Sequence, residues 1–284
     1  MSSKQKSSFD DSVAICNELD FAASEAYKML RTSVQYGFPD VEGCKIIGIT
    51  SSERNEGKST IATNLAYMLS CDSQKVLLME GDMRLPSLSA KLDLPSTQGL
   101  SDYLTGRITS DSNFIQYSKK APNLPILCAG MAPPNPSELL GSERMKKFLD
   151  KIRNAFDFII LDLPPVNIVS DPLSVAKYID GFIIVTRNEF TTRYGVTEVV
   201  KKLKIVDAKI LGFVLNGDGV SNGSSYSKKY SKYSKYDKYS NGKYGKGASY
   251  DDGSYEESYD TASRKKKEAV SAQDPQNSDD KNQL

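Results

Sequence analysis

Four short apolar runs, separated by segments of helical periodicity, constrain the fold of this chain more than any other feature. They are continuous in Ile, Leu and Val, and they occupy Lys45–Ser51, Lys75–Glu80, Phe156–Leu161 and Gly181–Thr186. Continuous runs of this length are typical of parallel strands that are covered on both faces. Two further strands are expected at Leu124–Cys128 and Lys209–Leu215. The sequence therefore predicts an α/β domain, a doubly wound and mostly parallel sheet with right-handed crossovers.

Four helices are expected around these strands. One follows Lys58 and places Ile61 and Leu65 on one face, and another carries the apolar repeat from Val196 to Leu203. A long helix is expected from Ser137 to about Ala155, and a shorter one over Ser24–Tyr36 with Ser24 as its N-cap.

Composition divides the 284 residues into an N-terminal segment with a helix (1–44), a folded domain (45–220) and a disordered tail (221–284) rich in Ser, Gly, Lys and Tyr. The absence of histidine and the four scattered cysteines argue against a disulfide framework, a Cys/His zinc site and a Ser-His-Asp triad. The net charge of +1 indicates no particular partner. No apolar run approaches the ~18 residues that cross a bilayer, so we expect a cytoplasmic protein.

The first strand leads into a loop that ends in Gly57-Lys58-Ser59, and a helix follows. Backbone N–H groups at such a helix N-terminus point toward a phosphate, and the helix dipole favours its charge. We expect Lys58 to reach the β- and γ-phosphates of ATP and Ser59 to hold Mg²⁺. The strict pattern has glycine where this chain has Ser52, so a helix that begins with Gly-Lys-Ser by chance is the alternative. The loop residues expected to bind nucleotide are Asn55, Glu56, Gly57, Lys58, Ser59 and Thr60.

Acidic residues end two of the predicted strands. Glu80 and Asp82 follow the second strand and Asp162 follows the Phe156–Leu161 run. Open α/β sheets bind ligands at this carboxyl edge, and a carboxylate beside a triphosphate needs a cation between them. We therefore expect Ser59, Asp82 and Asp162 to hold Mg²⁺. The alternative is that these acids cap the next helix or turn.

Nine of the sixteen tyrosines lie in the tail. A tethered set of phenol hydroxyls beside a phosphate-donor site predicts self-phosphorylation, and a flexible segment of ~30 residues spans ~30 Å, enough to reach a neighbour's site. A solvated tail without function and a Lys/Tyr strip for nucleic acid are the alternatives, the second opposed by the acidic residues from Asp251 onward. The predicted phosphate acceptors are Tyr226, Tyr230, Tyr233, Tyr236, Tyr239, Tyr244, Tyr250, Tyr255 and Tyr259.

As a set, these motifs resemble the bacterial tyrosine kinases (BY-kinases) of capsule and exopolysaccharide synthesis, which have the P-loop NTPase fold. The resemblance rests on Glu80-x-Asp82-x-Arg84, on Asp162 before Pro164-Pro165, on the Ala132–Leu140 segment and on the terminal tyrosines. The family usually has Asp at the position of Glu80. Its N-terminal Glu-x-x-Arg-x-x-Arg motif, linked to ring-shaped self-association, reads Glu25, Lys28 and Arg31 here.

The resemblance implies an ATP- and Mg²⁺-dependent protein-tyrosine kinase. Glu80 is the candidate to orient or deprotonate the tyrosine hydroxyl, and Arg84 to orient the acids or face the phosphate. Asn216 is expected to read adenine. Asp171 is a weaker candidate for a site residue, because Ser170-Asp171-Pro172 is also a good helix start. The expected catalytic residues are Lys58, Glu80, Asp82, Arg84 and Asp162.

The resemblance also implies partners and a location. These are a transmembrane activator of the polysaccharide co-polymerase type, a phosphotyrosine phosphatase, a ring-like homo-oligomer, and a place at the inner face of the cell membrane through the activator. Control of exopolysaccharide or capsule polymerisation and export is the implied role, without nucleic acid. The alternatives are a partition- or septum-type ATPase switch, whose second loop lysine is Glu53 here, and a non-catalytic ATP-binding regulator.

Overall fold

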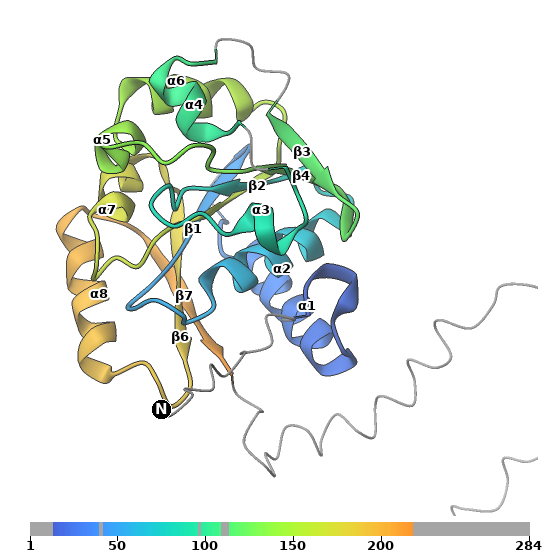
Figure 1. Cartoon of the computed structure of the whole chain (residues 1–284). Helices are drawn as coiled ribbons and strands as arrows, with labels where there is room; N and C mark the ends of the chain where they lie inside the picture. Colours follow the sequence, from blue (N-terminus) through green and yellow to red (C-terminus); the bar gives the residue numbers. More distant parts are fainter. Residues whose placement is uncertain (1–13, 40–41, 96–97, 109–113, 218–284) are drawn as a thin grey trace, which may run out of the picture. The chain divides into compact units, whose positions relative to one another are not determined.

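The computed structural model describes residues 14–39, 42–95, 98–108 and 114–217. Its centre is a seven-stranded sheet in the order β3-β4-β2-β5-β1-β6-β7 (Figure 1). All neighbouring strands pair parallel except β3 and β4, which pair antiparallel. The strands are β1 (Lys45–Ser51), β2 (Val76–Glu80), β3 (Ile115–Ser118), β4 (Ala121–Leu127), β5 (Phe158–Asp162), β6 (Gly181–Arg187) and β7 (Ile210–Asn216).

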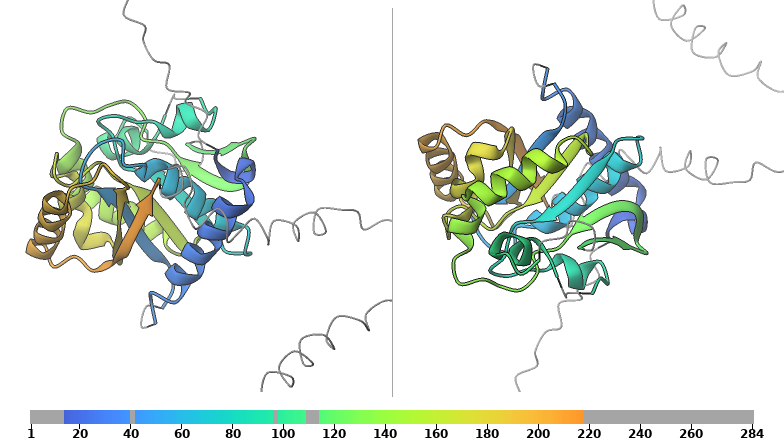
Figure 2. Two further views of the ribbon diagram at one scale, coloured as in Figure 1. Left: turned by 90° about the horizontal axis from the view of Figure 1, so that it is seen from below. Right: turned by 90° about the horizontal axis from the view of Figure 1, so that it is seen from above.

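The doubly wound, mostly parallel sheet is confirmed, and helices cover both of its faces (Figure 2). α1 to α3 pack on one face, and α4 to α8 pack on the other. The helices are α1 (Phe21–Gln35), α2 (Lys58–Ser70), α3 (Leu88–Lys91), α4 (Leu100–Thr105), α5 (Pro136–Leu140), α6 (Glu143–Ile152), α7 (Asp171–Val175) and α8 (Arg193–Ile205), with short 3₁₀ turns η1 (Cys16–Glu18) and η2 (Ala176–Tyr178).

Alternation along each central strand explains the two layers. In β1, Ile46 contributes to the core under α4 to α8, whereas Ile47 and Ile49 contribute to the core under α1 to α3. Successive side chains of a strand point to opposite faces, so a strand that is covered twice has to be apolar at nearly every position. This is why the continuous apolar runs predicted the sheet.

Two helix predictions were wrong in detail. The helix expected from Ser137 to about Ala155 is two helices, α5 and α6, because the chain breaks at Gly141 and the Ser142 hydroxyl caps α6 by accepting from the Met145 N–H. The helix expected to start at Ser24 begins at Phe21, because the Asp20 carboxylate accepts from the Ala23 N–H and is the cap.

Two of the three residues predicted for self-association, Glu25 and Lys28 of α1, pair with each other, and the third, Arg31, contacts α2. Lys28 Nζ lies 2.6 Å from Glu25 Oε1. Arg31 instead turns toward the end of α2, where Nη1 donates to the Met68 carbonyl at 3.5 Å and Nε lies 4.0 Å from an Asp72 carboxylate oxygen. Glu25 and Lys28 therefore remain as the outward part of the predicted self-association surface.

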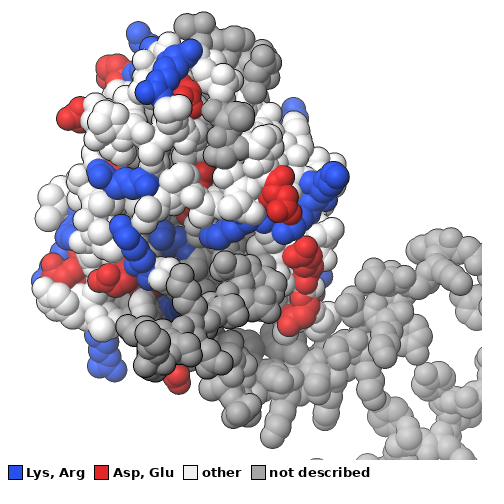
Figure 3. Space-filling model, in the orientation of Figure 1, with Lys and Arg blue, Asp and Glu red and all other residues white. Residues whose placement is uncertain are grey.

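Charge on the visible surface is mixed. Basic side chains are interspersed with acidic ones on the face in Figure 3, as the net charge of +1 leads one to expect. Among the described residues, no helix combines the length and apolar character needed to span a membrane. The predicted tail and its nine tyrosines lie outside the described residues.

Candidate active site

The loop between β1 and α2 is shaped by two residues with left-handed backbone. Asn55 has φ 63° and Gly57 has φ 95°. A Cβ on Gly57 would lie 2.0 Å from Asn216 Nδ2, so glycine is needed for space as well as for conformation. α2 begins at Lys58 directly after this turn. Its free N–H groups and the turn make the concave donor surface that suits a phosphate.

The loop is braced from the side by residues that are distant in sequence. Asn216 Nδ2 donates to the Glu56 carbonyl at 3.0 Å, and Arg187 Nη1 donates to the Asn55 carbonyl at 3.0 Å. The Glu56 side chain is fully buried, and its carboxylate accepts from the Glu53 N–H at 2.8 Å and from the Thr191 hydroxyl. The predicted nucleotide residues Glu56 and Asn216 thus hold the shape of the loop.

A cavity of about 500 Å³ opens beside this brace. Arg187 and Thr191 were not predicted from the sequence to belong to the site, because neither lies in a recognisable motif. The lining residues are Thr186, Arg187, Asn188, Glu189, Thr191, Arg193, Val196, Thr197 and Leu215.

Asp162 is a buried acid at the carboxyl end of β5. It ends β5 in register with Ile49 of β1 and Glu80 of β2, and its side chain is 1% exposed. Neither carboxylate oxygen has a hydrogen-bond partner by distance and angle among the described residues. Burial raises the pKa of Asp162 to about 7, although the nearby Lys58 ammonium and Ser59 hydroxyl act in the opposite direction. A buried carboxylate without a partner is costly, and a bound cation would remove that cost.

Asp82 lies in the loop after β2 and is partly buried. Its Oδ1 accepts from the Leu85 N–H at 3.1 Å. Burial raises the pKa of Asp82, and the Leu85 N–H and the Lys58 ammonium oppose that shift. Both Asp82 and Asp162 therefore interact electrostatically with Lys58, the loop lysine.

The donor set suits a hard cation. Two carboxylates and the Ser59 hydroxyl are oxygen ligands of the kind that Mg²⁺ takes, usually together with water and substrate phosphates. The described residues contain no cluster of three or more His, Cys, Asp or Glu side chains that would form a closed metal cage. An open site that is completed by a nucleotide fits these observations.

Glu80 ends β2, as predicted, and its carboxylate is bound by backbone N–H groups. Its carboxylate is 1% exposed and accepts from three backbone N–H groups, those of Ser87, Leu88 (2.8 Å) and Ala129 (3.0 Å). Burial raises the pKa of Glu80, and these three hydrogen bonds oppose the shift. The carboxylate joins the end of β2 to the start of α3 and to the residues after β4. This geometry does not fit the expected role of Glu80 in deprotonating a tyrosine.

Arg84 makes its side-chain contacts with Asp171 and Ser137. Its guanidinium binds the buried carboxylate of Asp171. Asp171 therefore both begins α7 and pairs with Arg84.

Residues 44–213 match the family model described as an AAA domain. The tyrosine-protein kinase YwqD of Bacillus subtilis is 34% identical over 203 residues, which cover 72% of this chain and 84% of YwqD. The chain belongs to the bacterial tyrosine kinases.

A solved structure agrees with this membership. The kinase domain of the Escherichia coli tyrosine kinase ETK superposes on this kinase with a TM-score of 0.66 at 31% identity, over 72% of this chain and 80% of that domain. The cell-division ATPase MinD of Pyrococcus furiosus matches with a TM-score of 0.53 at 27% identity, over 63% of this chain and 74% of MinD. The BY-kinase therefore shares its P-loop fold with the ATPase class that was the alternative, and the predicted kinase class is confirmed.

Proposed function

We propose that this kinase transfers the γ-phosphoryl group of Mg²⁺-bound ATP to tyrosines of its own C-terminal segment, Tyr226 to Tyr259. The observation that carries the proposal is the buried carboxylate of Asp162 beside Lys58 and Ser59 in a tyrosine kinase, since neither of its oxygens meets the distance and angle of a hydrogen bond to any described residue. A metal-bound triphosphate supplies both a cation for the Asp162 carboxylate and an anion for the loop.

Each site residue has a proposed task. The loop amides from Asn55 to Thr60 and the Lys58 ammonium bind the β- and γ-phosphates. Ser59, Asp82 and Asp162 hold Mg²⁺, which neutralises charge on the transferring group. Asn216 and Glu56 keep the loop in its phosphate-binding shape, and a contact of Asn216 with the adenine is proposed in addition.

The acceptor hydroxyl needs orientation more than a strong base. Phosphoryl transfer passes through a loose transition state, in which positioning and charge stabilisation supply most of the catalysis. A tyrosine hydroxyl has a pKa near 10, so it arrives neutral and can lose its proton late. We therefore propose that Glu80 supports the site rather than acting as its base.

The proposal extends to the cell. We place this kinase at the inner face of the cell membrane through a membrane-spanning activator, with control of exopolysaccharide or capsule polymerisation and export as its role. A phosphotyrosine phosphatase reverses the phosphorylation, and a ring-like homo-oligomer uses the outward surface at Glu25 and Lys28, while Arg31 holds this helix to the end of α2. Membership of the BY-kinase family supports each of these assignments.

Phosphopeptide mapping tests the central claim. Wild-type protein, Lys58→Met and the control Lys201→Met, an exposed lysine on α8 that pairs with Glu198, are each expressed as the sole copy in the native cells. Phosphate on Tyr226–Tyr259 is expected in wild type and the control and is expected to be absent from Lys58→Met. Equal phosphorylation of all three would mean that another enzyme modifies the tail, and its absence from wild type would also contradict the proposal.

A further inference from the structure

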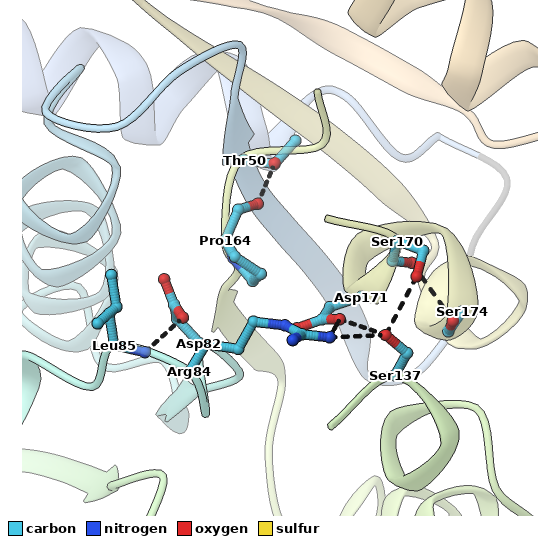
Figure 4. A network of polar contacts seen from close by, with 9 residues as sticks. All are labelled: Thr50, Asp82, Arg84, Leu85, Ser137, Pro164, Ser170, Asp171 and Ser174. Carbon is cyan, nitrogen blue, oxygen red and sulfur yellow. Dashed lines mark hydrogen bonds and ion pairs between the residues drawn. The ribbon is translucent and has the colours of Figure 1, made fainter. Parts of the chain in front are cut away.

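A bidentate ion pair joins the loop after β2 to the start of α7. Arg84 Nε lies 2.8 Å from Asp171 Oδ2, and Arg84 Nη2 lies 2.9 Å from Asp171 Oδ1 (Figure 4). The Asp171 side chain is fully buried, whereas that of Arg84 is 39% exposed. Two parallel N–H···O bonds fix the plane of the guanidinium as well as its position. The head of Arg84 is thus held at the start of α7.

Ser137 at the start of α5 is the third member of this contact. Its hydroxyl donates to Asp171 Oδ1, lies 3.1 Å from the Ser170 hydroxyl and accepts from Arg84 Nη2 at 3.2 Å. Figure 4 shows the three side chains converging from three separate segments. Removing Arg84 would leave a buried carboxylate with only hydroxyl partners close by, which is a strong reason for the pair to stay closed.

Asp82 lies in the loop between the Arg84–Asp171 ion pair and a set of backbone hydrogen bonds to Asp162. On its N-terminal side, the N–H groups of Gly81 and Asp82 donate to the Asp162 carbonyl at 2.7 and 3.1 Å. On its C-terminal side, the Leu85 N–H bonds the Asp82 carboxylate itself at 3.1 Å. Arg84, two residues after Asp82, is the point at which the loop is tied to the starts of α7 and α5. A carboxylate on a loop that is fixed at both ends loses less conformational freedom when it binds a cation.

We propose that Asp171 and Ser137 are positioning residues that act through Arg84 to hold the Asp82 carboxylate ready for the metal. This rests on the assignment of Asp82 to Mg²⁺ in the proposed function. Arg84 itself is then a positioning residue and makes no contact with the phosphates. The interaction explains why the loop uses arginine, since lysine offers no planar fork to a carboxylate.

Asp171→Asn is the decisive variant, because it keeps the size of the side chain and leaves behind only a half-exposed arginine. Hydrogen–deuterium exchange of the metal-free protein is expected to speed up over residues 82–88. The Mg²⁺ concentration for half-maximal activity is expected to rise about 10-fold, the lower end of the usual effect for residues that orient a metal ligand. Turnover at saturating Mg²⁺ is expected to stay within about 3-fold of wild type, and nucleotide affinity in EDTA to stay unchanged.

Three comparison variants make the outcome specific. Asp93→Asn is the matched control, because Asp93 is an exposed acid in an ion pair with Lys120 and asparagine tolerates its left-handed backbone. Arg84→Lys keeps the charge without the fork and is expected to fall between wild type and Asp171→Asn. Ser137→Ala is expected to give a smaller effect of the same kind, and it tests the inference even where Asp171→Asn folds poorly.

The inference is overturned if Asp171→Asn, Arg84→Lys and Ser137→Ala all match Asp93→Asn in Mg²⁺ requirement and in exchange over residues 82–88. Asp82→Asn separates this failure from a failure of the proposed function. If Asp82→Asn raises the Mg²⁺ requirement and the other three do not, only the positioning role is lost. If Asp82→Asn has no effect on that requirement, the assignment of Asp82 to the metal is lost with it.

Discussion

Glu80→Gln distinguishes a structural carboxylate from a catalytic base. The wild-type side chain accepts from three backbone N–H groups, two on Oε1 and one on Oε2. The amide of glutamine has one acceptor oxygen and one donor nitrogen. At best it keeps the two bonds to Ser87 and Leu88, and its –NH₂ group then faces the Ala129 N–H, so that two donors oppose each other.

The size of the effect follows from this count. An unsatisfied buried N–H costs about 1–3 kcal/mol, and the two surviving bonds each weaken by about 1 kcal/mol when the acceptor loses its charge. Against this, the neutral amide no longer carries the burial cost that raises the pKa of Glu80. We expect a net loss of about 2 kcal/mol in the free energy of unfolding, or about 4–8 °C in Tm for a domain of this size.

Two assays together test the reasoning. Denaturant unfolding gives the stability change, with Glu18→Gln, an exposed glutamate in η1, as the control. Initial rates of autophosphorylation at saturating Mg²⁺ and ATP, measured well below the Tm, give turnover. We expect turnover within about 10-fold of wild type, because removal of a general base typically costs 10²–10⁴-fold.

The opposite pattern of stability and turnover would refute a structural role for Glu80. Unchanged stability with a loss of turnover of 100-fold or more, and with the acid limb of the pH–rate profile gone, would make Glu80 the base. That result would also mean that the carboxylate leaves its three backbone partners during the reaction.

Two further predictions concern other buried acids. In metal-free protein, Asp162→Asn is expected to be more stable than wild type at pH 8 by up to about 4 kcal/mol, because the folded-state pKa of about 7 lies above the unfolded value and the ionised group opposes folding. The native state binds the extra proton between about pH 4 and 7, so the advantage should shrink as pH falls through 7 and vanish near pH 4 in pH-dependent unfolding; equal stability at pH 8 would contradict it. Thr191→Val removes the hydroxyl that donates to Glu56. We expect the free energy of unfolding to fall by about 1–3 kcal/mol and calorimetry to show weaker ATP binding. Thr32→Val on α1, an exposed threonine whose hydroxyl donates to the Lys28 carbonyl, serves as its control, and unchanged ATP affinity in Thr191→Val would show that the brace does not shape the loop.

Most of the sheet could be predicted because strands that are buried on both faces have nearly continuous apolar sequences. The β1 prediction matches residue for residue, and the ends of β2, β5 and β6 differ by one or two residues. β3 and the helices α3 and α4 were missed, since elements of four to six residues are too short to show a period, whereas the helix start at Ser170-Asp171-Pro172 matches the beginning of α7. The break between α5 and α6 depends on Gly141 and the Ser142 cap, a local signal that the longer apolar pattern hides.

The sequence by itself determined where the chemistry of this kinase lies. A phosphate-shaped loop after β1 and acids at the ends of β2 and β5 have to meet at one edge, because parallel neighbouring strands end there together. Only the tertiary structure decided what each side chain touches. Glu80 meets the backbone of Ala129, Arg84 meets Asp171, and Glu56 meets Thr191, across 49, 87 and 135 residues of chain. A hydrogen bond needs its two atoms within a few tenths of an ångström of the right distance, and only the packed fold sets that distance for residues so far apart.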